Sequence, residues 1–251
     1  MADDRAPTRF HEHTLGQGPV ELVWLHGWGL SHDSLVGLAR GLETRATNRL
    51  LDLPGFGATP MLAPGAGSAD YAAGLAAHLG PKTGPRVLIG HSFGARVAVR
   101  LAAADAGACD ALVLIAGAGI RPPRPWPRRL RAWMIGRLVK LGRLAGPATQ
   151  ERLRRRFGSA DYAQAGPLRA TLVSVVNENL TEPAAGIGCP VLLLYGAEDT
   201  ETPPTVGEAY AAALPDGRLK VLPGFGHLDI LSRGAHQCAR HITRILDEIY
   251  P

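Results

Sequence analysis

The sequence predicts an α/β fold with a mostly parallel central sheet and an inserted helical segment. Short apolar runs recur along the chain, helical stretches separate them, and each run ends in glycine or in a polar residue. Strands that are apolar on both faces and alternate with helices are typical of a parallel sheet covered on both sides. Ligands of such folds bind beyond the carboxyl ends of the strands, which is where these polar residues lie.

The expected elements follow in chain order, beginning with an N-terminal strand that carries His11 and His13 on one face. These two imidazoles could bind a metal, but a solvated strand edge is the favoured interpretation, and no metal is expected. A helix is expected at 95–104 and another near the C-terminus, where His236 and His241 are surface or packing residues. Further strands are expected at 20–25, 49–51, 86–89, 111–115, 191–195 and 219–222.

Between Ile115 and Val191 the alternation stops for roughly 75 residues, too long for a structureless loop inside a compact domain. A second helical stretch is expected at 168–180. We therefore expect a helical cap at 118–186, inserted into a core domain made of 1–117 and 187–251. Within the cap, one apolar arc with helical spacing consists of Leu130, Trp133, Met134, Leu138, Leu141 and Leu144.

Composition excludes several classes of protein. Hydrophobic residues at 46% and charged residues at 20% are near globular averages, and no apolar run approaches the roughly 18 residues of a membrane span. The N-terminal MADDRAPTRF has acids where a signal peptide needs positive charge, so a cytoplasmic location is expected. Cys109, Cys189 and Cys238 lack CxxC spacing, so we expect free thiols and neither a disulfide framework nor a zinc site.

The strongest chemical signal is Gly90-His91-Ser92-Phe93-Gly94, which follows an apolar strand and precedes a helix. A G-x-S-x-G sequence in this context predicts a nucleophile elbow, a tight strained turn that leaves no room for side chains at the glycine positions. Ser92 would then project into the cleft as the nucleophile. The alternative is a serine that merely caps the helix.

A serine nucleophile needs a base and an orienting carboxylate. His227 lies in a glycine-flexible loop after the last predicted strand, which makes it the best of the nine histidines for the base. Asp199 follows the strand at 191–195 and is preferred as the carboxylate over the adjacent Glu198, which would point elsewhere. The chain order Ser92, Asp199, His227 is that of the strand–elbow–helix hydrolase design.

The segment His26-Gly27-Trp28-Gly29 ends the first central strand and lets the backbone approach the nucleophile closely. The backbone N–H groups of Trp28 and Phe93 are the predicted oxyanion hole. His26 is expected to brace this loop, and His91 is a candidate pocket or packing residue.

Together these motifs resemble the α/β-hydrolase superfamily: HGWG, DLPGFG, GHSFG, GAEDTETP and GFGH occur in the usual order across 20–250, apart from the cap. LVWLHGWGL with DLPGFG looks particularly like the small carboxylesterases that demethylate a pimeloyl ester on acyl carrier protein. The resemblance implies a triad of Ser92, Asp199 and His227, an oxyanion hole at Trp28 and Phe93, and an α/β-hydrolase fold.

The expected function is therefore a serine carboxylesterase that acts on a small-molecule ester without a cofactor. Superfamily members include C–C bond hydrolases, perhydrolases and acyltransferases on the same triad, and these remain alternatives. A catalytically silent ligand-binding member would not need all three triad residues, so the intact set argues against that class.

The net charge of +5 is unevenly distributed, because residues 121–156 carry +11 and the rest of the chain carries −6. This basic segment of the cap could attract an acidic carrier protein or an anionic membrane surface. A solvated arginine-rich face is the alternative. Nucleic acid is not expected, since only Trp126 and Trp133 interrupt the basic residues.

Overall fold

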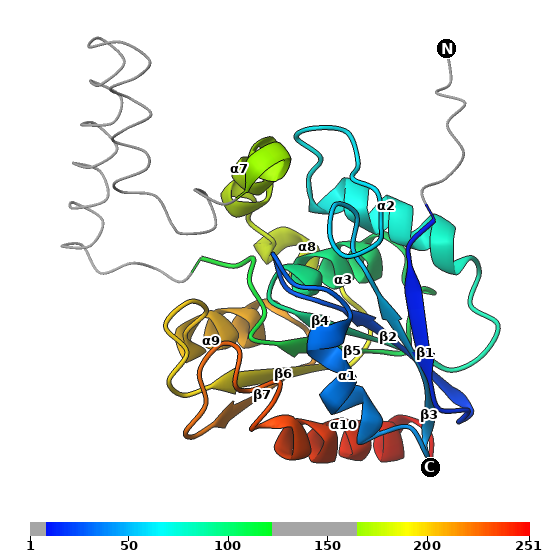
Figure 1. Cartoon of the computed structure of the whole chain (residues 1–251). Coiled ribbons are helices and arrows are strands. Elements are labelled where there is room, and N and C mark those ends of the chain that lie inside the picture. Colours follow the sequence, from blue (N-terminus) through cyan, green and yellow to red (C-terminus); the bar gives the residue numbers. More distant parts are fainter. Residues whose placement is uncertain (1–8, 122–164) are drawn as a thin grey trace, which may run out of the picture.

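The computed structural model describes residues 9–121 and 165–251 and has a seven-stranded sheet at its centre (Figure 1). The strand order is β1-β3-β2-β4-β5-β6-β7. β1 is antiparallel to β3, and every other neighbouring pair is parallel, which confirms the predicted fold class. The strands are β1 (Glu12–Leu15), β2 (Val20–Leu25), β3 (Ala46–Leu51), β4 (Arg86–His91), β5 (Ala111–Ile115), β6 (Val191–Gly196) and β7 (Gly217–Leu222).

Helices cover both faces of this sheet, with α2 and α3 on one side and α10 on the other (Figure 1). The described helices are α1 (Asp33–Arg40), α2 (Ser68–Leu79), α3 (Phe93–Ala104), the short 3-10 turn η1 (Gly166–Leu168), α7 (Arg169–Asn177), α8 (Thr181–Ala185), α9 (Pro204–Ala213) and α10 (Ala235–Ile249). Among them no helix is long and apolar enough to cross a bilayer.

Two hydrophobic layers sandwich the sheet because successive strand residues point to opposite faces. In β2, Val23 and Leu25 pack beneath α2 and α3, whereas Leu22 and Trp24 pack against α1 and α10. All four side chains are fully buried. Each such side chain contributes about 1.5–3 kcal/mol of transfer free energy, which fixes the strand register and with it the positions of the loops at the strand ends.

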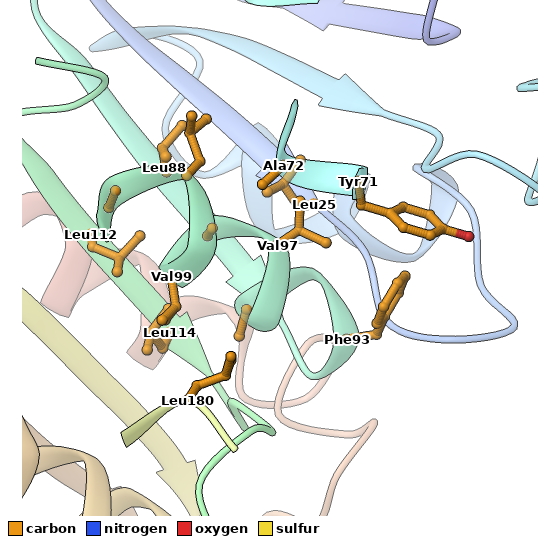
Figure 2. Close-up of a cluster of buried hydrophobic side chains, with 14 of the residues drawn as sticks. Leu25, Tyr71, Ala72, Leu88, Phe93, Val97, Val99, Leu112, Leu114 and Leu180 are labelled. Atoms are coloured by element: carbon orange, nitrogen blue, oxygen red, sulfur yellow. The ribbon is translucent and has the colours of Figure 1, made fainter. Parts of the chain in front are cut away.

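Helix α3 is the central element of the first layer. Figure 2 shows Val97 and Val99 of α3 among leucines of the neighbouring strands, with Phe93 at the start of the helix beside Tyr71 of α2. Because α3 is clamped between the sheet and α2, its first residue has a fixed position relative to the end of β4. That first residue is Phe93, which directly follows Ser92, so the position of Ser92 is fixed with it.

The sheet has a topological switch point between β2 and β4. After β2 the chain passes through α1 and forms β3 on one side of β2. It then passes through α2, on the opposite face of the sheet from α1, and forms β4 on the other side of β2. In open α/β sheets the crevice beyond such a point is where ligands bind. The predicted oxyanion residue Trp28 follows β2 and the predicted nucleophile Ser92 follows β4, so both border this crevice.

Some element boundaries differ from those predicted. β3 begins at Ala46 because Asn48, a polar residue that breaks the apolar run, is buried and accepts a 2.9 Å hydrogen bond from Trp24 Nε1. α3 begins at Phe93, two residues earlier than expected. The stretch predicted as one helix at 168–180 ends at Asn177, and a separate short helix, α8, follows at Thr181–Ala185.

The predicted cap is described only at its two ends. Its apolar arc from Leu130 to Leu144 and its basic segment beyond Arg121 lie outside the described residues. At its C-terminal end, Leu180 and Ala184 are fully buried in the same cluster as α3, and α8 packs against α3 and α9. The division into a core and a cap at 118–186 stays a prediction.

Candidate active site

Ser92 lies on the turn between β4 and α3, with a left-handed backbone (φ 49°, ψ −104°) that a non-glycine residue rarely adopts. The two glycines of the motif make this turn possible. A Cβ on Gly94 would lie 2.1 Å from the carbonyl oxygen of Leu25, and a Cβ on Gly90 would lie 2.6 Å from the backbone of Ala95. Helix and sheet therefore approach each other more closely than any side chain would allow, and the serine is pushed outward.

The structure brings Ser92, His227 and Asp199 together in a hydrogen-bonded chain. Ser92 Oγ lies 3.0 Å from His227 Nε2, and His227 Nδ1 lies 2.7 Å from Asp199 Oδ2. With Nδ1–H donated to the carboxylate, Nε2 presents a lone pair to the serine hydroxyl. Both distances are within normal hydrogen-bonding range, so the imidazole is placed to take the serine proton.

Asp199 is held as a carboxylate by several donors. Its Oδ1 accepts hydrogen bonds from the backbone N–H groups of Glu201 and Thr202 at 2.8 and 2.9 Å. Burial by itself raises the pKa of Asp199, but the hydrogen bonds from His227 and from Thr202 outweigh it, and the net pKa is lowered. Glu198, the alternative carboxylate, is exposed, and no hydrogen bond or ion pair joins its side chain to His227 among the described residues.

The hydroxyl of Thr202 joins the acid to the neighbouring strand. Its Oγ1 lies 2.8 Å from Asp199 Oδ2 and 2.9 Å from the carbonyl oxygen of Ala116, the residue that follows β5. Thr202 is buried, and Ala116 has a positive φ of 47°. Sequence reasoning did not single out Thr202, although it lies within the GAEDTETP motif three residues after the acid.

The loops that carry Asp199 and His227 are packed directly against each other. Backbone N–H groups of Ala197 and Glu198 donate to Leu222 and Phe225 at 2.9 and 3.0 Å. A Cβ on Gly196 would lie 2.2 Å from the carbonyl oxygen of Phe225, so only glycine permits this approach. The loop that carries Asp199 and the loop that carries His227 are thus joined by backbone hydrogen bonds.

His91, the neighbour of the nucleophile, is buried and contacts the base loop. Its Nε2 donates to the carbonyl oxygen of His227 at 3.1 Å, and the two rings lie 4.9 Å apart. Burial, followed by the charge of His227, lowers the pKa of His91 to about 3, so its ring is neutral at neutral pH. His91 therefore ties the nucleophile turn to the backbone of the base.

The predicted oxyanion residues lie on facing backbone segments. Trp28 lies in a turn closed by the 3.3 Å bond from Leu30 N–H to Gly27 O, and Phe93 opens α3, where first-turn N–H groups have no intrahelical acceptor. Their rings meet edge to face at 5.4 Å. Phe56 and Tyr71 complete the aromatic cluster, at 5.0 Å from Trp28 and 5.1 Å from Phe93.

This aromatic cluster was not predicted, because its members come from four distant parts of the chain. Each edge-to-face pair adds about 0.5–1.5 kcal/mol beyond area burial. The Tyr71 hydroxyl donates to Pro54 O at 2.9 Å, which fixes the cluster to the DLPGFG loop. The rings of Trp28 and Phe93 are therefore packed together with Phe56 and Tyr71 in one cluster.

His26 braces the loop, as expected. It is fully buried, its Nδ1 donates to Gly27 O at 2.7 Å, and its Nε2 accepts from Leu53 N–H at 3.0 Å. Burial lowers the pKa of His26, which keeps the ring neutral and both bonds intact. The loop after β2 is thereby attached to the loop after β3.

A small cavity of about 150 Å³ opens directly onto the nucleophile. Glu201, which sequence reasoning missed, is 65% exposed there and places Oε2 3.6 Å from His227 Nε2. A larger hollow of about 660 Å³ lies between α2, α3 and α8 and touches none of the triad. The lining of the small cavity consists of Gly27, Trp28, Leu30, His91, Ser92, Glu201, His227 and Leu228.

Comparison with known proteins adds independent information. The sequence model of the alpha/beta hydrolase family matches residues 22–241. A pimeloyl-[acyl-carrier protein] methyl ester esterase from Chromobacterium violaceum is 32% identical over 87% of this chain and 91% of its own. The enzyme of the same name from Nitrosomonas europaea is 29% identical over 88% of this chain and 94% of its own.

Solved structures share the fold. A thermophilic esterase from Thermogutta terrifontis superposes with a TM-score of 0.70 at 24% identity, covering 96% of this chain and 94% of that one. A putative non-heme bromoperoxidase from Mycobacterium tuberculosis reaches a TM-score of 0.72 at 22% identity, covering 100% of both chains. At these identities the likeness concerns the fold alone.

Proposed function

The chain belongs to the alpha/beta hydrolase family, and on that premise we propose that it is a carboxylesterase that acts through an acyl-enzyme on Ser92. The observation that carries the proposal is the continuous relay from Ser92 Oγ through His227 to Asp199, with contacts of 3.0 and 2.7 Å. The curated relatives are named as esterases, which supports ester hydrolysis as the reaction.

In the first half-reaction, Ser92 Oγ attacks the ester carbonyl while His227 Nε2 takes the hydroxyl proton. Asp199 holds Nδ1–H and stabilises the imidazolium that forms. The carbonyl oxygen becomes an oxyanion, which the N–H groups of Trp28 and Phe93 would bind. The helix dipole of α3, whose N-terminal end begins beside Ser92, adds a favourable positive potential there.

The tetrahedral intermediate then collapses, and His227 gives its proton to the leaving alcohol. In the second half-reaction a water molecule, deprotonated by the same imidazole, attacks the acyl carbon and releases the acid. Each oxyanion donor is worth roughly 10²–10³ in turnover. The groups that act on the substrate and on this water are side chains and backbone groups of this chain.

The test is a panel of p-nitrophenyl esters of increasing acyl length with the wild type, Ser92→Ala and the control Ser232→Ala, which changes an exposed serine outside the site. We expect Ser92→Ala to lose on the order of 10³–10⁶ in turnover, and Ser232→Ala to match the wild type. An unchanged rate in Ser92→Ala would remove this serine from the mechanism. Adding a C–C diketone substrate and a peracid assay tests the alternative reactions of the same triad.

We further propose an acyl ester linked to a carrier protein as the substrate class. The names of the relatives support this narrower proposal, since both are called esterases of the methyl ester of pimeloyl-[acyl-carrier protein]. In the sequence, the charge of +11 at 121–156 supports it as well, because a basic segment would attract an acidic carrier protein.

The experiment compares kcat/KM for a methyl ester on acyl carrier protein with that for a small neutral methyl ester as salt is raised. We expect the carrier-linked substrate to be favoured at low salt and to lose this advantage as screening increases, while the small ester is unaffected. Equal rates and equal salt dependence would contradict carrier recognition without touching the esterase proposal. Binding to anionic vesicles, measured in parallel, tests the membrane alternative.

A further inference from the structure

Three imidazoles converge at the β1–β3 edge of the sheet, outside the candidate active site. The rings of His11 and His13 lie 5.4 and 5.5 Å from the ring of His32. His13 lies in the edge strand β1, and His11 comes directly before that strand, two residues earlier, whereas His32 comes from the loop that leads into α1. Strand and loop meet at one surface that solvent can reach.

The spacing of these rings matches metal ligation. With metal–nitrogen bonds of about 2.0–2.1 Å in a tetrahedral site, the ring centres of two ligating histidines are roughly 5 Å apart. One ligand atom from each of His11, His32 and Asp52 already lies within 4.8 Å of the others. His13 is not in this group as the structure stands, but both His11 and His13 are exposed, so their side chains are free to rotate toward a common ion.

The backbone that presents His11 is fixed. Its N–H donates to Thr59 Oγ1 at 2.8 Å, and its carbonyl accepts from Asp52 N–H at 2.9 Å. This second bond continues the β1–β3 pairing beyond Glu12, which faces Leu51 in the register. The two strand imidazoles are thus carried by a rigid sheet edge instead of a free terminus.

His32 is oriented by a buried carboxylate. Asp52 is 1% exposed, and its Oδ1 accepts from His32 Nδ1 at 2.9 Å and from His32 N–H at 2.8 Å. Its Oδ2 accepts from Ala58 N–H at 2.9 Å. With Nδ1 held, His32 is left with Nε2 as its ligand atom, which is the carboxylate–histidine arrangement that supports metal-bound imidazoles.

We propose that His11, His13 and His32 form a binding site for a divalent transition-metal ion, with Zn²⁺ as the reference, and that Asp52 orients His32. Imidazole nitrogens favour Zn²⁺, Ni²⁺ and Cu²⁺ over Mg²⁺ and Ca²⁺. The exposed carboxylate of Asp33, 3.4 Å from His32 Nε2, is a fourth donor of opposite charge to the ion. The bound ion would link the edge strand to the loop that also carries Trp28.

The site is tested by calorimetric titration of the untagged full chain with Zn²⁺, and by the visible absorption of Co²⁺, which reports ligand number and geometry. We expect one ion per chain, a rise in melting temperature with Zn²⁺ and no response to Mg²⁺. His11→Ala and His13→Ala should each weaken binding at least ~10-fold, and Asp52→Asn by about 10–100-fold, as for other partners behind a ligand.

The matched control is His236→Ala, which removes an exposed histidine of α10 far along the chain. The two strand variants change exposed side chains, so their melting without metal should equal that of the wild type. Zn²⁺ affinity that is the same in His11→Ala, His13→Ala and His236→Ala would overturn the site, because adventitious surface coordination would then explain the binding. Ester turnover of His13→Ala, measured with a metal chelator present, should equal that of the wild type. This measurement separates a failure of the metal site from a failure of the proposed esterase function.

Discussion

The turn that carries Ser92 and the loops that carry Asp199 and His227 meet in one cleft, but different forces place them. The serine turn can be recognised from its neighbours in sequence, Gly90 and Gly94, which lack the Cβ atoms that would lie 2.6 Å or less from the backbone of Ala95 and from Leu25 O of β2. The acid and base loops depend on bonds between residues far apart in sequence. A nucleophile can therefore be encoded locally, whereas its proton relay is a property of the tertiary fold.

The largest effect is expected at the carboxylate of the relay. Asp199→Asn keeps the shape of the side chain but offers His227 a neutral partner and the wrong tautomer, so kcat should fall by about 10⁴. Glu198→Gln, its exposed neighbour, is the matched control and should leave ester turnover near wild type. Comparable losses in the two variants would mean that the acid has been assigned to the wrong residue.

The second effect concerns the stability of the serine turn. Gly94→Ala places a methyl group 2.1 Å from Leu25 O, where neither helix nor strand can move away, so unfolding free energy should drop by about 3 kcal/mol or more. Gly37→Ala, at an exposed position of α1 with nothing within 4 Å, should instead gain about 0.5–1 kcal/mol. Urea unfolding of both variants measures the contrast, and a stable Gly94→Ala would refute the steric account.

The third effect is a pH dependence of the free energy of unfolding. It is caused by His91, which connects the serine turn to the loop that carries His227. Its pKa is about 3 in the folded protein and about 6.5 when unfolded, so the unfolded state binds the proton first as pH falls. The contribution of neutral His91 to the free energy of unfolding is fully present above pH 6.5 and is lost as the pH falls toward 3. The loss is about 2 kcal/mol at pH 5.

His91→Gln retains a donor near His227 O but does not titrate. The drop in unfolding free energy between pH 7 and pH 5 should be smaller in this variant than in the wild type by about 2 kcal/mol. His236→Gln, an exposed change, should keep the wild-type slope. Parallel slopes for His91→Gln and the wild type would show that the ring is not buried neutral.

The smallest predicted effect is at Thr202. Thr202→Val removes the hydroxyl shared by Asp199 Oδ2 and Ala116 O but keeps the backbone N–H bond to Oδ1. We expect kcat to fall about tenfold with KM unchanged, equivalent to ~1.4 kcal/mol for one hydrogen bond to a charged group. Thr202→Ser should restore most of the rate; if it does not, the methyl packing and not the hydroxyl is what matters.

The features that could be predicted from the sequence alone are the local ones, and those that could not are contacts between distant residues. The apolar strands and the GHSFG turn are local patterns, and the structure contains each of them, although some strand boundaries differ from those predicted. Asp199 could be preferred over Glu198 but not proved, because the deciding donors come from the fold of the loop. β3 was predicted too short, since a buried Asn48 bonded to Trp24 is invisible to a hydrophobic pattern.

The unpredicted parts of the site are contacts between distant segments. The bond from His91 to His227 O spans 136 residues. Phe56 and Tyr71 pack against Trp28 and Phe93 only because two loops and two helices converge there. Such contacts have no signature in a single sequence, since neither partner is unusual in its own neighbourhood.

The most direct test of the acyl-enzyme on Ser92 is to trap it. The protein is quenched in acid during turnover of a p-nitrophenyl ester and analysed by mass spectrometry of the intact chain and its peptides. We expect one acyl group per chain, attached to Ser92, absent from Ser92→Ala and accumulating in the wild type before hydrolysis. An acyl group on another residue, or full turnover by Ser92→Ala, would contradict it.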